Sequence, residues 1–446
     1  MSKIIKLSKG LDIRLEGEAQ KSITDVALAS QYAVSPLDFE NLVPKMLVKV
    51  GDKVKAGSSL FFDKNCPAIV FPSPVSGTVS AVNRGEKRRI LSVVIDADQD
   101  QQYESFDMVD PKVASRDDIV CLLLKSGLWT LLVQRPYGVL AQPADMPKAI
   151  FVSAFDTAPL APCYNFIMES EKEALQKGFQ VLSRLTSGKV HLGYNAKCEA
   201  PSFEGVELHA FQGKHPAGNV GVQIHHICPI SKGEKVWTMN YQDVAILGRF
   251  FLTGKVDLHR TIALAGSSVK NPSYYRIISG IKTDAVLSGQ LKEDHVRVIS
   301  GDVLTGRKLQ YSDFIGLKAN MLTVIPEGDT YEFMGWAMPR FKKFSVSRAY
   351  FSWLCPKKKY TLDTNLNGGV RPFVVTGLYE KYLPMDIYPM HLLKAIIAED
   401  IDKMESLGIY EVIEEDIALC EFVDPSKIEM QQILRNGINA LIKEGE

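Results

Sequence analysis

A short loop at residues 213–219 (GKHPAGN) combines residue types that could bind a flat ligand. His215 can donate a hydrogen bond and titrates near neutral pH. Pro216 makes the adjacent backbone rigid, and Gly218 lets the backbone come close to a ligand because glycine has no Cβ. The alternative is that His215 only makes hydrogen bonds within a turn.

Two aromatic residues in the segment 126–138 (SGLWTLLVQRPYG), Trp129 and Tyr137, could provide flat apolar walls for such a ligand. The alternative for Trp129 is that its ring fills the core.

The group His225-His226-x-Cys228 also suggests a metal site. We expect a strand here, whose alternation would turn the two histidines to opposite faces, and structural zinc needs four ligands. The sequence therefore predicts no metal site.

The composition excludes several classes of protein. The 52 basic and 52 acidic residues cancel, which argues against a nucleic-acid binder, since such a protein needs a basic surface. Seven scattered cysteines without a C-x-x-C motif indicate reduced thiols. The N-terminal residues do not have the pattern of a signal peptide, and no apolar run approaches the ~20 residues that cross a bilayer. We therefore expect any link to a membrane to run through partner proteins.

The first region, which we delimit as 1–100, contains short strands and tight turns between Pro44 and Ile95. Its V-G-D-x-V-K-x-G and S-P-x-S-G-x-V motifs resemble the biotinyl/lipoyl carrier fold, a barrel-sandwich hybrid. In such carriers a modified lysine lies between the two halves, and Lys64 is the candidate here. The segment lacks the Met-Lys-Met signature, so we predict a spacer without a covalently bound group.

The remaining chain is predicted to form an α/β multidomain protein. Apolar strands at 148–154 and 190–194 alternate with helices at 169–185 and 240–252, which predicts an α/β domain with a parallel sheet over 101–256. A strand pair, a short helix and a return strand predict a β-grasp module at 257–330. We expect a connecting β region at 331–375 and a helical domain at 376–446, in which one amphipathic helix ends at Gly408.

Several blocks, in order along nearly the whole chain, resemble one family. They are SKGLDIRLEG (8–17), SGLWTLLVQRP (126–136), AIFVSAFDTAPLAP (149–162), GKHPAGNVGVQIHHICP (213–229) and VWTMNYQDVAILG (236–248). The chain resembles the A subunits of sodium-translocating NADH:quinone oxidoreductases. Relatives of that family are the C subunit of the Rnf complex and the NADH-oxidising flavoprotein of complex I. The resemblance implies a Rossmann-like α/β domain, an SLBB-like β-grasp module and a ferredoxin-like helical domain.

The resemblance also shows what this chain has lost. Cluster-binding relatives hold iron–sulfur clusters with runs of four cysteines, because a four-iron cluster needs four thiolates. The second run aligns here with Glu414, Ile417, Cys420 and Asp424, and the first, which includes Tyr379, retains no cysteine. The glycine-rich loop that binds FMN in relatives aligns with 126–132, where Leu128 and Trp129 are bulky. We therefore expect neither clusters nor FMN.

The resemblance implies a peripheral subunit on the cytoplasmic side of the bacterial inner membrane. The complex would reduce ubiquinone or another quinone with electrons from NADH and move Na⁺ from cytoplasm to periplasm. NADH, FAD, FMN and iron–sulfur would be bound by other subunits, and the main partner would be the membrane-embedded, flavin-carrying subunit.

Within this function the chain itself would have no catalytic residue. It would contribute to quinone binding through His215, Pro216, Gly218, Trp129 and Tyr137. Two alternatives stay open at this point. One is a stand-alone soluble ligand-binding module, and the other is an Rnf-type electron-transport subunit that has lost its clusters.

Overall fold

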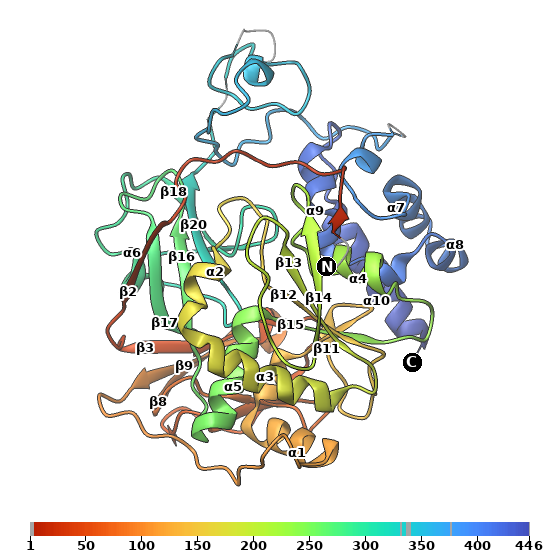
Figure 1. The fold of residues 1–446 in the computed structure, drawn as a ribbon. Helices are drawn as coiled ribbons and strands as arrows, with labels where there is room; N and C mark the ends of the chain where they lie inside the picture. Colours follow the sequence, from red (N-terminus) through yellow and green to blue (C-terminus); the bar gives the residue numbers. More distant parts are fainter. Residues whose placement is uncertain (1–3, 331, 336–339, 375–376, 446) are drawn as a thin grey trace.

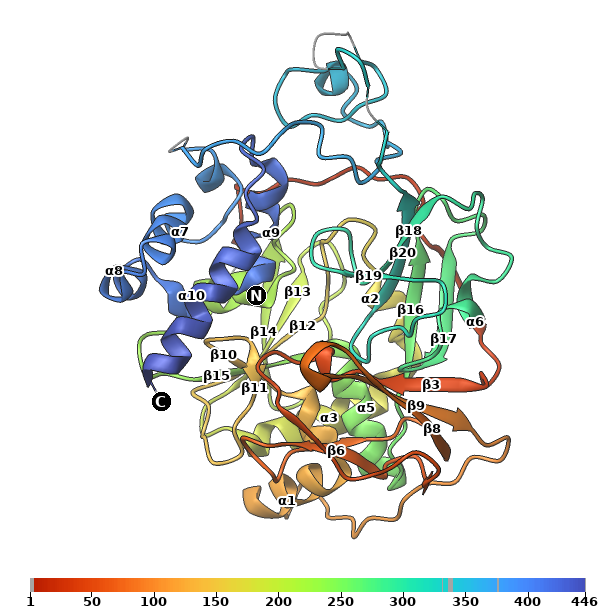
Figure 2. The ribbon, with the colours of Figure 1, turned by 180° about the vertical axis from the view of Figure 1, so that it is seen from behind.

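The computed structural model describes residues 4–330, 332–335, 340–374 and 377–445. The boundary that we drew between residues 375 and 376 falls outside these ranges. Two larger sheets lie side by side, a small barrel packs beneath them, and a group of helices flanks the first sheet (Figures 1 and 2). Within the described residues, no helix combines the length and the apolar character needed to cross a membrane.

The central sheet confirms the predicted α/β region. Five of its strands are parallel, and β10 and β11 form an antiparallel pair at one edge. In spatial order the strands are β1 (Ile5–Lys6), β14 (Val206–Gln212), β13 (Val190–Asn195), β12 (Ile150–Ser153), β15 (Val236–Asn240), β10 (Val133–Arg135) and β11 (Val139–Leu140). The expected strands at 148–154 and 190–194 are thus β12 and β13.

Two helices, α3 (Lys172–Leu185) and α5 (Tyr241–Thr253), cover one face of this sheet (Figure 1). The first of them buries apolar residues that recur at helical spacing in the sequence: Ala174, Leu175, Phe179, Leu182 and Leu185. The helices touch through glycines. A Cβ on Gly248 would lie 1.7 Å from the Ala174 carbonyl oxygen, and one on Gly178 would lie 2.2 Å from that of Val244.

The opposite face of the sheet is covered by α4 (Val220–Ile227). Phe151, Ile224 and Val236 form the core between α4 and the sheet. The strand that we expected at His225 and His226 is therefore wrong. Asn219 is extended and starts the helix. The buried positions 221 to 224 go once around the helix, so that Val222 packs with the C-terminal helices and Ile224 packs on the sheet.

The barrel region consists of two small sheets. Their strands are β3 (Gln31–Val34), β9 (Ile90–Ala97), β8 (Gly77–Arg84) and β5 (Lys53–Val54) in one, and β4 (Pro44–Met46), β6 (Ser59–Asp63) and β7 (Val70–Pro72) in the other. Gly51 and Gly57, which lie between these strands, have φ angles of 95° and 96°, a conformation that glycine adopts readily. The barrel packs on α1 (Arg116–Ser126) and on the short helix η3 (Leu128–Leu131).

Two short strands of the region that we assigned to the barrel, between residues 5 and 25, pair with the two larger sheets. Strand β1 joins β14 of the central sheet. Strand β2 (Gln20–Asp25) joins β17 (Ser273–Ile278) of the second sheet. Alternation and turn residues predict a strand, but not its partner, and these partners lie far along the chain.

The second sheet contains the elements predicted for residues 257–330. Strands β16 (His259–Ala265) and β17 form an antiparallel pair, α6 (Asp284–Leu287) follows, and β20 (Met321–Pro326) returns parallel to β16. Two further strands, β18 (Val296–Ser300) and β19 (Arg307–Leu309), complete it.

The connecting β structure expected at 331–375 is not found. The described part of this segment contains no strand, only the short helix η5 (Phe351–Leu354) and an isolated bridge between Tyr360 and Leu15. Its lysines and the Gly368-Gly369 pair favour irregular backbone over a paired ladder. This segment forms the lobe at the top of Figure 1.

The C-terminal helices are α7 (Pro389–Ile397), α8 (Ile401–Ser406), α9 (Glu414–Val423) and α10 (Met430–Gly445). The single helix that we predicted to end at Gly408 is two helices. Glu399 has a φ of 54°, and the Asp400 side chain accepts a hydrogen bond from the Lys403 amide to start α8. The predicted end is confirmed, since Gly408 follows α8 with a φ of 89°.

Candidate functional site

Polar side chains gather at the carboxyl edge of the central sheet. Asp156 and Thr157 follow β12, and the loop 213–219 follows β14. Parallel strands present their carboxyl ends at one edge, where α/β sheets bind ligands. The start of α9 closes this edge, because the Asn219 side chain donates a hydrogen bond of 3.0 Å to the Glu415 carbonyl. We call Asp156, Thr157, His215, Asn219 and Glu415 the carboxyl-edge cluster.

His215 is held from several sides and is only 4% exposed. Its amide donates to the Asp12 carboxylate at 3.0 Å, and its Nδ1 lies 3.2 Å from the Thr157 hydroxyl. That hydroxyl accepts from the Gly218 amide at 2.9 Å, so its own proton is available to Nδ1. This arrangement favours the tautomer with the proton on Nε2. Burial lowers the pKa of His215, which keeps the ring neutral at neutral pH.

Gly218 permits a close approach, but to this chain's own backbone. A Cβ there would lie 2.7 Å from the Thr157 nitrogen. The loop 213–219 is thus pressed against the end of β12, with a cis bond between His215 and Pro216. His215, Pro216 and Gly218 therefore lie together in one packed turn. This placement also agrees with the alternative that His215 only makes hydrogen bonds within a turn.

Asp156 is a carboxylate of this edge whose acidity is altered. It is partly buried, and its side chain accepts a hydrogen bond of 2.8 Å from the Ala158 amide. Burial, followed by the charge of Asp302, raises its pKa to about 6. A carboxyl group with such a pKa can exchange a proton near neutral pH, a property that is enriched at functional sites.

Asp156→Asn is expected to stabilise the protein at high pH. The pKa of Asp156 rises from 3.8 to about 6 on folding, so stability falls as pH rises through this interval. The full cost above pH 6 would be about 3 kcal/mol for a dry site, and partial exposure reduces the expected gain to about 1–2 kcal/mol. Urea unfolding at about pH 8 and pH 4 measures it.

The exposed Asp100→Asn serves as the control for this prediction. The difference between Asp156→Asn and wild type must shrink as the pH falls toward 4. A gain that is equal at both pH values would show that the carboxylate charge is not its cause.

Below this edge, on the α4 face, lies a buried ion pair. Arg135 and Asp416 have side chains 1% and 0% exposed, and Nη1 of the first lies 2.6 Å from Oδ2 of the second. Arg135 also contacts the Glu415 carboxylate. A Cβ on Gly221 would lie 2.4 Å from Oδ1 of Asp416. Only glycine at position 221 therefore lets α4 pack this close to the ion pair. The pair joins the sheet to α9.

Tyr137 follows this arginine on the same segment. Its carbonyl accepts a hydrogen bond of 2.9 Å from Arg435, and its ring centroid lies 6.3 Å from that of Tyr410. The ring is only partly buried and packs with the C-terminal helices. Tyr137 and the loop 213–219 therefore meet α9 and its neighbours from two sides.

Trp129 lies elsewhere. It is fully buried on η3, its centroid is 5.3 Å from that of Trp237, and its Nε1 donates to the Ala141 carbonyl at 2.7 Å. Trp237 points to the face covered by α3 and α5, because it alternates with Val236, which packs under α4. The ring of Trp129 therefore fills the core, as the alternative for this residue stated. It does not lie beside His215.

The segment 126–132, which aligns with the flavin loop of relatives, is packed against the barrel. A Cβ on Gly127 would lie 2.5 Å from the Pro72 ring. Leu128, Thr130 and Leu131 line a cavity whose volume is about 20 Å³. That volume holds roughly one water molecule.

The histidines that suggested a metal site are engaged separately. His225 Nδ1 lies 2.7 Å from the Glu411 carboxylate, and its Nε2 accepts from the Asp386 amide at 3.0 Å. His226 Nδ1 lies 2.9 Å from the Val222 carbonyl. We argued against a metal here from the alternation of a strand, and that argument does not apply because α4 is a helix. The separate contacts of the two histidines argue against a shared metal instead.

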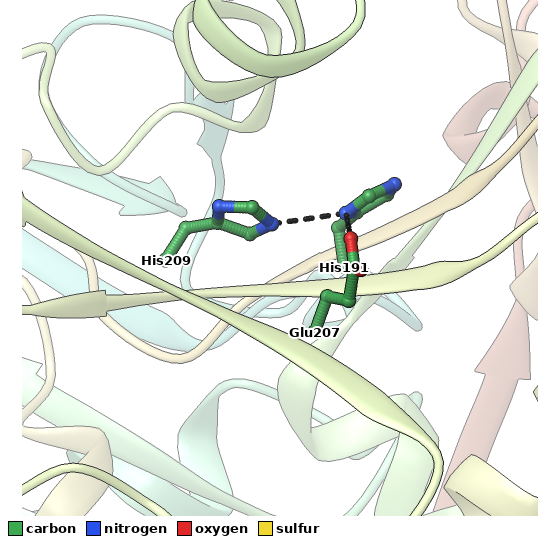
Figure 3. Close-up of side chains that lie close together, drawn as sticks. All are labelled: His191, Glu207 and His209. Atoms are coloured by element: carbon green, nitrogen blue, oxygen red, sulfur yellow. Dashed lines mark hydrogen bonds and ion pairs between the residues drawn. The ribbon is translucent and has the colours of Figure 1, made fainter. Parts of the chain in front are cut away.

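Sequence reasoning missed a different group, formed by His191, Glu207 and His209 (Figure 3). His191 Nδ1 lies 3.0 Å from His209 Nε2 and 3.4 Å from the Glu207 carboxylate. Burial lowers the pKa of His191 to about 4 and lowers that of His209. A signal was present in the sequence, since Glu207 and His209 alternate on one strand and so share a face.

The comparisons with known families cover most of the chain. Residues 5–98 match the NqrA N-terminal barrel-sandwich hybrid domain. Residues 114–256 match the NqrA second alpha/beta domain, and residues 261–310 match the NQRA C-terminal domain. The first match agrees with the two small sheets of the barrel region.

Two relatives that match over their full length carry the same name. The A subunit of the Na(+)-translocating NADH-quinone reductase from Neisseria meningitidis serogroup B is 39% identical over 448 residues, which cover 99% of this chain and 100% of the relative. The protein of the same name from Cellvibrio japonicus is 38% identical over 447 residues, with 99% and 100% covered. A solved NAD⁺-reducing [NiFe]-hydrogenase is similar at 11% identity and a TM-score of 0.35, covering 67% of this chain and 55% of that one. This last likeness is too distant to inform the site.

Proposed function

The chain belongs to the family of Na⁺-translocating NADH-quinone reductase A subunits, and from this premise we propose that it is a peripheral member of such a complex that carries no redox cofactor. The observation that carries the proposal is the identity of 38–39% over the full length of relatives with that name. The complex reduces ubiquinone or another quinone with electrons from NADH and moves Na⁺ from cytoplasm to periplasm. This chain binds on the cytoplasmic side to the membrane-embedded, flavin-carrying subunit.

The proposal has a direct test. The chain is expressed with and without the other subunits of the complex, and cell fractions are compared. We expect it in the membrane fraction only when its partners are present, and Na⁺ uptake by inverted vesicles should require it. Vesicles that pump Na⁺ equally well without the chain would contradict the proposal.

Contacts at the positions that align with the cluster-binding cysteines of relatives support the proposal that this chain carries no redox cofactor. Tyr379 and Asp424 both align with cysteines of cluster-binding relatives, and the Tyr379 hydroxyl donates to the buried Asp424 carboxylate at 2.7 Å. Cys420 is 1% exposed, and burial raises the pKa of its thiol to about 12. A thiol that resists deprotonation is a poor iron ligand. These contacts support the assignment of iron–sulfur clusters to other subunits, and we propose the same for NADH, FAD and FMN.

We also propose finer fold relationships for the three regions after the barrel. The α/β region is Rossmann-like, residues 257–330 form a β-grasp module, and the C-terminal helices form a ferredoxin-like domain without clusters. The strand pair, α6 and the parallel return of β20 support the second assignment.

We place the contribution to quinone binding at the carboxyl-edge cluster. Quinone heads need an apolar slot with one or two well-placed donors. The Nε2 proton favoured for His215 is such a donor, and Asp156 can exchange a proton near neutral pH. Pro216, Gly218 and Tyr137 shape the surroundings, whereas we assign Trp129 to the stability of the fold. The site is completed by a membrane partner.

His215→Ala in the assembled complex is expected to raise the KM for quinone by about tenfold. Removing one donor from a carbonyl costs about 1–3 kcal/mol. Thr157→Val should have a smaller effect in the same direction, because it removes the hydroxyl that favours the Nε2 proton. Quinone titrations of NADH-driven reduction measure both.

The control is His295→Ala, an exposed histidine with a carboxylate partner, Asp329. The KM for NADH should stay constant in all three variants. A quinone KM equal to wild type in His215→Ala and Thr157→Val, with the complex intact, would place the site elsewhere.

A further inference from the structure

We propose that His191, Glu207 and His209 form a binding site for a divalent transition-metal ion of the Zn²⁺ class. Within the described residues they are the one group of at least three possible ligands whose ligand atoms all lie within 4.8 Å of one another. The inference goes beyond the reductase function and does not depend on it.

The register of two parallel strands brings the three side chains together. His191 on β13 is paired with Glu207 on β14, and Gly193 is paired with His209. Side chains at paired and alternate positions share a face, so all three project to the α4 side of the sheet. Figure 3 shows the two imidazole rings and the carboxylate directed toward one another.

The spacing of the ligand atoms suits tetrahedral coordination. Ligands about 2.0–2.1 Å from a metal at tetrahedral angles lie about 3.3 Å from one another. The two distances here are 3.0 Å between the imidazole nitrogens and 3.4 Å between His191 Nδ1 and the Glu207 carboxylate. A metal can therefore replace the hydrogen bond between the imidazoles with small movements of the side chains.

The ligands are also oriented by their neighbours. His191 is 8% exposed, and its ring stacks on Phe151 at a centroid distance of 4.5 Å. Lys189 contacts one oxygen of Glu207 and leaves the other directed at His191. Supporting contacts of this kind hold metal ligands in place. Lys189 also places a positive charge nearby, which weakens the binding of a cation.

Two of the three ligands, Glu207 and His209, line an open hollow, from which water or an external ligand can reach the ion. This hollow has a volume of about 750 Å³, and it is lined by Ile4, Ile5, Lys6, Glu207, Leu208, His209, His226 and Ile227. A site with three protein ligands and one position open to water or an external ligand differs from a closed structural zinc site. Two imidazoles and one carboxylate favour Zn²⁺, Co²⁺ or Ni²⁺ over Mg²⁺ and Ca²⁺, which prefer oxygen.

The test is metal binding to the full chain, purified and treated with a chelator. Zn²⁺ affinity is measured by competition with a chromophoric chelator, and Co²⁺ absorption reports tetrahedral coordination. We expect one ion per chain in wild type. His209→Ala and Glu207→Gln, both at partly buried positions, should weaken binding by more than about 100-fold, beyond the usual effect of losing a supporting contact.

Two variants make the result specific. His295→Ala, in which an exposed histidine beside Asp329 is lost, should bind the ion as wild type does. Lys189→Met should bind more tightly, because it frees an oxygen of Glu207 and removes the nearby charge. Circular dichroism confirms that each variant is folded.

The absence of stoichiometric Zn²⁺ binding to wild type would overturn the proposal. Binding that persists unchanged in both His209→Ala and Glu207→Gln would also overturn it, because the ion would then occupy other residues.

Discussion

Arg135→Met is expected to destabilise the protein by about 3–5 kcal/mol, the cost of leaving one charge of a buried pair without its partner. Methionine preserves much of the apolar side chain but not the charge. Asp416, with a side chain that is 0% exposed, would keep only the Ile413 amide at 3.0 Å as a hydrogen-bond donor to Oδ2. Urea unfolding, followed by tryptophan fluorescence and by circular dichroism, measures the loss.

The cause can be separated from lost packing by a double variant. Arg135→Met with Asp416→Leu removes both charges, and replacing a buried pair by apolar residues is often close to neutral. We expect it to recover most of the lost stability. Arg135→Lys should be intermediate, because a single ammonium cannot contact Asp416 and Glu415 as the guanidinium does. Arg135→Met as stable as wild type would show that the ion pair does not contribute to the stability of the protein.

Trp129→Ala is expected to cost a similar amount, about 3–5 kcal/mol, because it removes a large, fully buried side chain. The cavity would open beside Trp237, whose ring packs edge-on at 85°. Trp129→Phe fills most of that space and should cost less, although the Ala141 carbonyl loses its indole donor. Thermal unfolding of both variants measures the difference.

The same variants test the role of this residue in quinone binding. Because Trp129 lies on the α3 and α5 face, Trp129→Phe complexes that remain folded should keep the wild-type quinone KM. His215→Ala complexes should not. A raised quinone KM in Trp129→Phe, at unchanged stability, would return the ring to the site that the sequence predicted.

The parts of the fold with local signals were predicted well. The helix α3 shows five buried residues at helical spacing, and Gly408 marks a helix end by its backbone freedom. The helix α4 was mispredicted because the segment is short, and because its glycine and histidines carry no strong periodicity. The break at Glu399 depends on one residue with a positive φ, which few sequence patterns reveal.

The site was harder to predict, because its residues are assembled by contacts distant in sequence. His215 stood out from its loop, but Thr157 and Asp156 reach it only through the parallel order of β12 and β14. Arg135 and Asp416 are 281 positions apart. His191 joins Glu207 only through the register of neighbouring strands. The spacing of residues in a sequence indicates which of them share a face of one helix or one strand. It does not indicate contacts between residues of different elements.

The two N-terminal strands impose an order on the synthesis of the protein. Strand β1 pairs with residues 211 and 212, and β2 pairs with residues of β17, between 273 and 276. At roughly 5–20 residues per second, a ribosome needs about 10–40 s to make the first partner after the first strand has emerged. The barrel can close during this interval, but residues 5–25 cannot find their partners. These two strands can therefore reach their native places, at the edges of the two larger sheets, only after β14 and β17 have been made.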